Sequence, residues 1–114
     1  MKVNKNQVWN YNNLIDSEPA AEGVKRKVLA YCEELMTVEN YFEEGAIGAR
    51  HHHSHTQITY VVSGQFEFEI NGIKKIVNPG DTMLKQDSVI HGCVCKKAGI
   101  LLDIFNPMRK DFVE

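Results

Sequence analysis

Four histidines within five positions are the most concentrated source of chemistry in this sequence. They lie in the stretch RHHHSHTQITYVVSG, from Arg50 to Gly64. Imidazole nitrogen is the commonest protein ligand for transition metals. The stretch lies near the middle of the chain, whereas an affinity tag belongs at a terminus. It therefore predicts a metal site or a flexible histidine tract, and the strand-like residues that follow it closely favour the metal site.

The spacing of these residues limits which of them could bind one ion together. Side chains of an extended chain point alternately to opposite sides, so ligands on a strand must lie an even number of positions apart. His52 fails that test, and four residues pass it: His51, His53, His55 and Gln57. Spacing alone thus leaves one histidine too many. A distant ligand would complete the set, and His91 follows a turn-like stretch, PGDTMLKQDSVIHG.

Length and composition limit the classes of protein to which the chain can belong. Its 114 residues fit one domain, with 43% hydrophobic and 25% charged residues, as in ordinary soluble globular proteins. A formal charge of −2 and a pI near 6.2 provide no basic surface for nucleic acid or an anionic membrane. No apolar stretch approaches the ~20 residues of a transmembrane helix, and the start, MKVNKNQVWNYNNL, does not resemble a signal peptide. We therefore expect a cytoplasmic protein without nucleic-acid or membrane partners.

The cysteines do not suggest a disulfide framework. There are three of them, Cys32, Cys93 and Cys95, and an odd number suits a reducing compartment. Cys93 and Cys95 would share one face of a strand. We expect them to pack inward as small hydrophobic residues rather than to act as ligands or as a redox pair.

Most of the remaining sequence consists of short strand-like runs. Residues 1–23 are polar and irregular, and DSEPAAEG within them is expected to form a helical turn. From residue 24 onward the expected strands are VKRKVLAYC, LMTVENYFE, TQITYVVS, QFEFEI, IKKIV, TMLK, GCVC and GILLDIF. QFEFEI alternates most clearly, with Phe66 and Phe68 on one face and Glu67 and Glu69 on the other. The pattern predicts an N-terminal extension over residues 1–23 and a β domain over residues 24–114.

Turn signals separate these runs. Asn71-Gly72 is a strong hairpin signal, because both positions of such a turn need a positive φ. NPGD, residues 78–81, predicts a second turn. Many short strands with frequent turns are typical of a sandwich or barrel, and closure of the sheets protects their edges. At the end of the chain, Asn106-Pro107 is expected to cap a short helix or turn in MRKDF.

Two stretches resemble the two sequence motifs of the cupin family. GARHHHSHTQITYVVSG resembles the first, a His-x-His followed by Glu or Gln and later Gly, and its matching residues are His51, His53, Gln57 and Gly64. GDTMLKQDSVIHGCVC resembles the second, with Gly80 and His91 in its positions and Gln86 where proline is usual. The resemblance spans residues 24–112.

This resemblance implies a fold and a metal site. The fold is all-β: a single-domain, cupin-type double-stranded β-helix, or jelly-roll barrel, with short N-terminal and C-terminal helical turns. The resemblance implies that one divalent transition metal ion is bound by His51, His53, Gln57 and His91. His52 would then face outward, and His55 would either lie beside the substrate or be exposed to solvent. Such mixed nitrogen and oxygen ligands admit Ni, Mn, Fe or Zn.

Three further features resemble the KdgF family of pectin-degradation cupins: HGCVC, LLDIFNPMRKDF and the Gln of the first motif. The match extends to EGVKRKVLAY and FEEGAIG. These cupins convert cyclic 4,5-unsaturated uronates, released from pectin and alginate, to linear keto sugars. The resemblance implies that Asp103 is the catalytic acid and base, that Phe105 lines the pocket and that Arg109 binds the substrate carboxylate. A homodimer is also expected.

The electrostatics of the implied ligands suit an anionic sugar. Three neutral imidazoles and an amide leave a divalent ion its full positive charge. A carboxylate in place of Gln57 would repel an incoming uronate by about 4 kcal/mol at about 4 Å and an effective dielectric constant near ~20.

Other interpretations stay open at this point. A metal-dependent dioxygenase could use the same neutral site, and a non-catalytic cupin could bind a sugar without turnover. Asp103 could be a structural aspartate paired with a neighbouring amide or lysine, and Arg109 could be a plain surface residue.

Overall fold

The computed structural model describes residues 1–114, which form ten strands and two short 3₁₀ turns. The turns are η1 (Asn12–Leu14) and η2 (Lys110–Phe112). The strands are β1 (Glu18–Ala21), β2 (Val24–Tyr31), β3 (Met36–Phe42), β4 (Ile47–His51), β5 (Thr56–Val61), β6 (Gln65–Ile70), β7 (Ile73–Val77), β8 (Thr82–Lys85), β9 (His91–Lys97) and β10 (Gly99–Asn106). No helix of the chain is long and apolar enough to cross a membrane.

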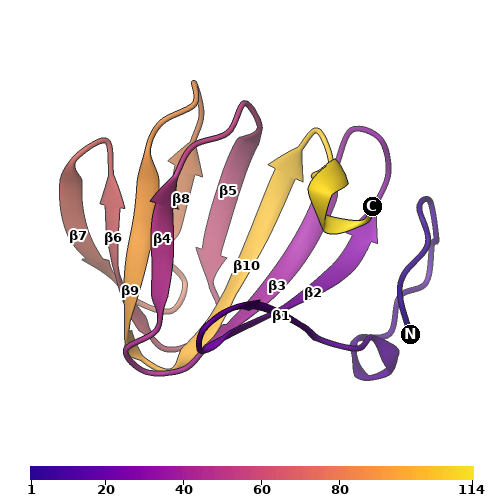
Figure 1. Cartoon of the computed structure of the whole chain (residues 1–114), viewed down its shortest axis with the longest axis horizontal. Coiled ribbons are helices and arrows are strands. Elements are labelled where there is room, and N and C mark those ends of the chain that lie inside the picture. The colour runs from indigo at the N-terminus through magenta and orange to yellow at the C-terminus, as the bar shows by residue number, and fades with distance from the viewer.

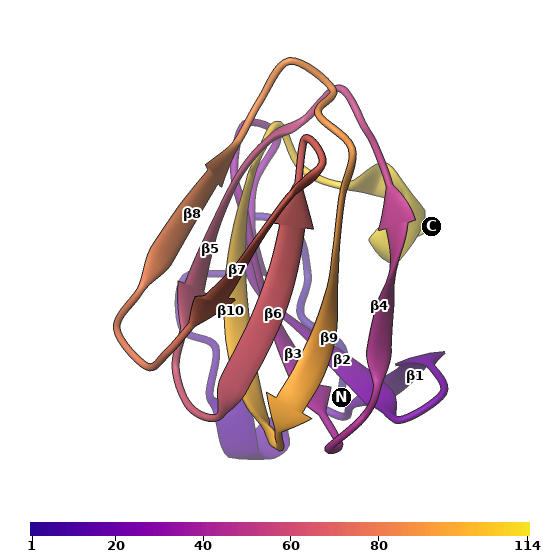
Figure 2. The ribbon, with the colours of Figure 1, turned by 90° about the vertical axis from the view of Figure 1, so that its left-hand side faces the viewer.

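The strands form two antiparallel sheets that face each other. One has six strands in the order β1-β2-β3-β10-β5-β8, and the other has four in the order β4-β9-β6-β7. Figure 1 shows the two sheets opening toward the end of the molecule where the C-terminal turn lies, and Figure 2 shows the four-stranded sheet in front of the larger one. This arrangement is a jelly roll with minor helical turns, so the predicted fold class is confirmed.

Alternation along the strands places the side chains that matter for the site. In β5, the buried residues Gln57, Thr59 and Val61 alternate with the exposed residues 56, 58 and 60. In β6, Phe66 and Phe68 are buried between the sheets, as their spacing predicts. One face of β5 therefore points into the space between the sheets, and the other points away from it.

The two sulfur atoms on β9 lie in the core. Cys93 and Cys95 are 8% and 1% exposed and pack with Phe42, Phe66 and neighbouring apolar residues. Burial raises the pKa of Cys93 to about 11, so its thiol is a poor nucleophile or metal ligand at neutral pH. The prediction that these residues pack inward is confirmed, and all three cysteines are free.

Two turns contain residues with positive φ values, which asparagine and glycine adopt more readily than other residues. Asn71 and Gly72 have φ values of 50° and 80° in the β6–β7 hairpin, as predicted. Gly64 has a φ of 80°, and a Cβ there would lie 2.5 Å from the carbonyl oxygen of Lys97. Only glycine allows the β5–β6 turn to pack so closely on the start of β10.

Two local predictions were wrong. DSEPAAEG contains strand β1 rather than a helical turn, because the segment pairs with β2 through Glu18 and Arg26. Asn106 does not cap a helix: it ends β10, and its side-chain amide donates to the carbonyl oxygen of Glu34 at 2.7 Å. The final turn begins only at Lys110. The first segment is thus shaped by pairing with the next strand, and the second by a contact with a residue distant in sequence.

Candidate metal centre and substrate cavity

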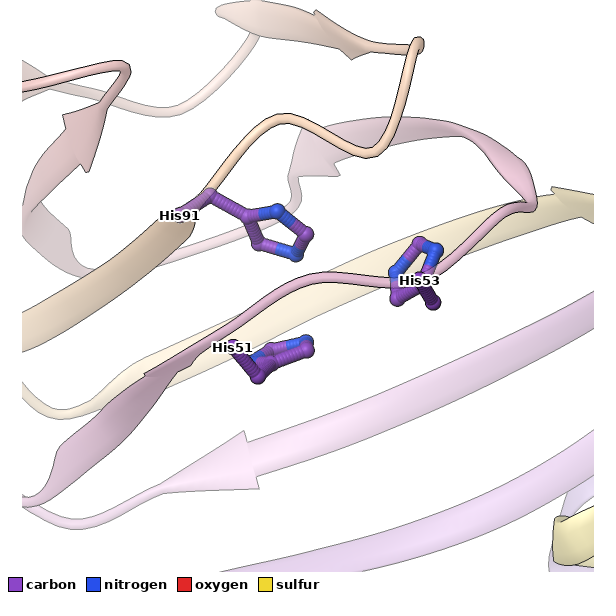
Figure 3. Close-up of side chains that lie close together, drawn as sticks. All are labelled: His51, His53 and His91. Atoms are coloured by element: carbon purple, nitrogen blue, oxygen red, sulfur yellow. The ribbon is translucent and has the colours of Figure 1, made fainter.

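Three histidines from two distant segments converge at one end of the sheets. His51 ends β4 and lies directly across from His91, the first residue of β9. His53 follows on the loop after β4, and its ring centroid lies 5.2 Å from that of His91. The ligand nitrogens of the three residues all lie within 4.8 Å of one another. Figure 3 shows His91 on one segment and His51 and His53 on another, with the three side chains close together.

Hydrogen bonds to the backbone fix the orientation of two of these rings. Nδ1 of His51 lies 2.8 Å from the carbonyl oxygen of Ala49, and Nδ1 of His91 lies 3.0 Å from that of Val89. A carbonyl accepts, so Nδ1 carries the proton and Nε2 presents a lone pair. Nε2 of His91 is buried and has no hydrogen-bond partner. A buried lone pair of this kind fits a metal ion.

Gln57 adds an oxygen to the cluster. Its side chain is 5% exposed, and its Oε1 lies 2.9 Å from Nε2 of His53. Its Nε2 donates to the hydroxyl oxygen of Thr59 at 3.3 Å, which turns the carbonyl oxygen toward the histidines. The four side chains thus offer three nitrogens and one oxygen, all neutral, and they fit a divalent transition metal ion.

Burial favours the neutral form of the His53 and His91 rings, which is the form that can bind a metal ion. It lowers the pKa of His91 to about 4, and the nearby charge of Lys85 acts in the same direction. Burial also lowers the pKa of His53. Both rings are therefore neutral at neutral pH, and an ion need not displace a proton to bind them.

The other two histidines lie outside this cluster. His52 is exposed. Nε2 of His55 lies 3.1 Å from the carbonyl oxygen of Met108, near the C-terminal turn. His55 does not line the cavity described below, so the geometry gives no support to its expected contact with substrate.

A cavity of about 320 Å³ opens beside the histidines, between the two sheets. Gln57, His51 and His91 line it together with polar and aromatic residues from the six-stranded sheet and the C-terminal turn. Those that carry charge, hydrogen-bonding groups or rings are Arg26, Asn40, Phe42, Lys85, Asp103, Phe105, Arg109 and Phe112. The cavity therefore joins the cluster of histidines and Gln57 to a set of charged side chains.

Asp103 is the one carboxylate among the residues that line this cavity. It is 8% exposed. Its Oδ2 accepts a hydrogen bond from the amide of Asn40 at 2.7 Å, and its Oδ1 accepts one from the hydroxyl of Thr59 at 2.6 Å. Both oxygens face donors, as an ionised carboxylate requires. The aspartate is thus paired with an amide and is also placed at the cavity wall.

Arg109 is held by the C-terminal turn. Its Nε and Nη2 donate to the two carboxylate oxygens of Asp111, at 3.0 and 2.8 Å. Its guanidinium lies over the rings of Phe105 and Phe112, 5.2 and 4.3 Å from their centroids. Arg26 lies 3.8 Å from the centroid of Phe112. Two guanidinium groups therefore flank the cavity, and one of them is already paired with a carboxylate.

The sequence interpretation missed four residues of this cavity and its hydrogen bonds: Arg26, Asn40, Thr59 and Lys85. Lys85 is the most unexpected, since it is only 3% exposed. Parity could have indicated Thr59, which lies two positions after Gln57. The place of Lys85 follows from its pairing with Gln57 on the neighbouring strand, which the sequence does not show.

Comparison with known proteins identifies the family of the chain. The family described as Cupin domain matches residues 39–105. The chain belongs to the cupin family. This cupin is 41% identical over 98 residues to the pectin degradation protein KdgF of Dickeya dadantii (strain 3937), a match that covers 84% of the chain and 89% of that protein.

Two solved structures resemble this cupin over nearly their whole length. An RmlC-like cupin from Shewanella frigidimarina superposes with a TM-score of 0.92 at 38% identity, covering 96% of this chain and 98% of the other. KdgF from Halomonas sp. superposes with a TM-score of 0.90 at 35% identity, covering 94% and 99%. The chain thus shares its fold with these two cupins. The matches to KdgF proteins agree with the resemblance found in the sequence motifs.

Proposed function

We propose that this cupin is a metal-dependent enzyme that opens cyclic 4,5-unsaturated uronate monosaccharides to their linear keto form. The observation that carries the proposal is the position of Asp103, a buried carboxylate in the cavity that His51, Gln57 and His91 also line. The similarity to two KdgF proteins supports the choice of substrate class. The substrate itself, from pectin or from alginate, is a small anionic sugar.

One divalent ion, Ni, Mn, Fe or Zn, would be held by His51, His53, Gln57 and His91. Such an ion supplies a positive charge that polarises oxygen atoms of a bound sugar. Because the four ligands are neutral, that charge would be undiminished toward an anion. The carbonyl groups of Ala49 and Val89 orient His51 and His91 for this task.

Asp103 would move the proton. The ring of the substrate is closed by a hemiacetal whose ring oxygen also belongs to an enol ether. Asp103 takes the proton of the anomeric hydroxyl, the bond from the anomeric carbon to the ring oxygen breaks, and its electron pair passes to that oxygen. The enolate formed then takes the proton back on carbon, which gives the keto group. No atom is gained or lost.

The walls of the cavity would hold the sugar. Phe105 offers an apolar surface beside Asp103 and His53, whose ring centroid lies 5.8 Å from that of Phe105. Arg109 would bind the substrate carboxylate with the donors that Asp111 leaves free. His55 would hold the C-terminal turn in place through its contact with the carbonyl oxygen of Met108.

The direct test is to mix the purified protein with unsaturated galacturonate and follow the absorbance of the enol ether. The proposal expects the absorbance to disappear with turnover and without consumption of oxygen. Oxygen consumption would identify the alternative, a metal-dependent dioxygenase. Binding of the sugar with no loss of absorbance would identify a non-catalytic sugar-binding cupin.

We also propose that the protein acts in the cytoplasm as a homodimer, without nucleic-acid or membrane partners. The free cysteines are consistent with a reducing compartment. The outer face of the six-stranded sheet carries a row of apolar side chains, in which Ile58 lies between Ile104 and Leu84 on neighbouring strands. A second copy of the same face would cover this row by two-fold symmetry.

A further inference from the structure

Lys85 is a buried amine without a carboxylate partner. It ends β8, is 3% exposed and lines the cavity. Its Nζ lies 4.7 Å from the ring centroid of Phe68 and forms no salt bridge. Burial lowers the pKa of Lys85, while the charge of Asp103 acts against that effect. Burial of a lysine is costly and is rarely found without a function or an ion pair.

The ammonium group of Lys85 has more N–H donors than hydrogen-bond acceptors within the protein. It carries three N–H groups, and the structure gives it one hydrogen-bond acceptor, the hydroxyl oxygen of Thr59 at 2.7 Å. Since the side chain lines the cavity, the remaining donors can reach a bound molecule there. The acceptor that would satisfy them is an oxygen of the ligand.

Thr59 connects this cation to the proposed proton carrier. Its hydroxyl oxygen accepts from Lys85 and from Gln57, which fills its acceptor sites, and its hydrogen is donated to Asp103. Lys85 and Asp103 are therefore held one hydroxyl group apart. A charge on Lys85 would therefore lie close to the substrate atoms between which Asp103 would move the proton.

We propose that Lys85 is a catalytic residue, whose ammonium donates to the ring oxygen of the substrate and stabilises the negative charge that this oxygen gains as the ring opens. The inference rests on the proposed function. In this step the bond from the anomeric carbon to the ring oxygen breaks, and the electron pair stays on the oxygen beside Lys85. The charge disappears when the enolate carbon takes the proton from Asp103.

Arg109 is less suited to this task than Lys85. Two of its donors are engaged by Asp111, and it lies on the C-terminal turn rather than beside Thr59. Arg109 can hold a group of the substrate that does not react. Lys85 is buried and is connected to Asp103 through the hydroxyl group of Thr59. A preorganised charge has its largest effect on the rate at such a buried position.

The test is Lys85→Met, which keeps the length of the side chain and removes the charge. We expect kcat to fall by ~10²–10³-fold, the usual effect of removing a group that stabilises an oxyanion, with KM within about threefold of the original. Metal content should not change, and Tm should stay equal or rise, because a buried charge is replaced by an apolar group. Lys74→Met, at an exposed position of β7, is the matched control and should keep full activity.

Lys85→Gln guards against a variant that fails to fold. It retains a polar contact with Thr59 but lacks the charge, so it should show the same loss of kcat. A structural lysine predicts the opposite of the expected pattern: a lower Tm with turnover nearly unchanged in the folded protein. That result in either variant would overturn the proposal.

A binding experiment separates this inference from the proposed function. Oxalate carries negatively charged oxygen atoms on two adjacent carbon atoms. The enolate and the carboxylate of the opening sugar are arranged in the same way. We expect calorimetry to give at least tenfold weaker oxalate binding in Lys85→Met than in the original protein at equal metal content. If the original protein does not open the unsaturated uronate but this difference holds, the proposed function fails while Lys85 remains an oxyanion-binding residue. Equal affinities would overturn the role of Lys85.

Discussion

At the scale of single residues, the site depends on neutral side chains held in fixed orientations. Backbone carbonyls orient His51 and His91, and Thr59 orients the amide of Gln57. A neutral ligand set favours an anionic substrate, whereas a carboxylate ligand would repel it. If the proposed function holds, glutamine at position 57 would therefore help to determine the specificity for an anionic sugar.

This argument predicts the effect of Gln57→Glu. The variant should retain its metal ion, since carboxylate oxygen is a good ligand, but it should bind galacturonate at least tenfold more weakly. Calorimetric titration of both proteins measures the difference. Galactose, which lacks the carboxylate, is the control and should bind both proteins equally. Unchanged affinity for galacturonate would show that its carboxylate does not approach the metal centre.

His91 predicts a dependence of stability on pH in the metal-free protein. Its pKa of about 4 in the folded chain lies below the ordinary value of 6.5, so the unfolded chain binds a proton first as the pH falls. The stability is complete above pH ~6.5 and should fall by up to about 3 kcal/mol as the pH approaches ~4. Urea unfolding at a series of pH values measures this loss. His91→Phe should show a shallower dependence, and equal slopes in the two proteins would contradict the assignment.

Much of the metal-binding cluster could be predicted from the sequence, because parity and the two motifs together select His51, His53, Gln57 and His91. Parity alone could not reject His55, whose contact with Met108 depends on how the C-terminal segment returns to the sheet. Lys85 could not be predicted, since a lysine at the end of a short strand usually extends into water. Its burial follows from the pairing of β8 with β5, which only the tertiary structure shows.

At the scale of elements, strands with strong local signals were predictable and those formed by tertiary pairing were not. The β6–β7 hairpin follows from alternation and from Asn71-Gly72. Strand β1 carries the sequence EPAA, which has no β-branched residue, and it is extended because β2 offers it a pairing edge. The division at residue 24 stays a prediction, and β1 places part of the preceding segment in the main sheet.

The outer face of β5 and β8 yields a prediction about assembly. Ile58 and Leu84 are 41% and 57% exposed, and we expect a second copy of the chain to cover them. The double variant Ile58→Glu and Leu84→Glu should halve the mass seen by light scattering, because charges would be buried in the interface. Ile73→Glu, on β7 and 61% exposed, should leave the mass unchanged. A monomeric original protein, or a double variant that stays dimeric, would contradict the expectation.

At the scale of the whole molecule, two facing sheets bring segments far apart in sequence to one cavity. The four-stranded sheet and the loop after β4 supply the histidines, whereas β10 supplies Asp103 and Phe105. The C-terminal turn completes the cavity with Arg109 and Phe112. The fold thus separates the positions that can hold a metal ion from the one that can move a proton, within a single space of about 320 Å³.

The turnover of Asp103→Asn tests the central claim most directly. Asparagine keeps the size of the side chain and can form hydrogen bonds with Asn40 and Thr59, but it cannot carry the proton. We predict that this variant retains its metal ion and its affinity for galacturonate, while the rate of opening of unsaturated galacturonate falls by ~10²–10⁴-fold. Asp16→Asn, in the exposed N-terminal segment, should open the sugar at the original rate. Ring opening by Asp103→Asn at nearly that rate would contradict the account and assign Asp103 a structural role.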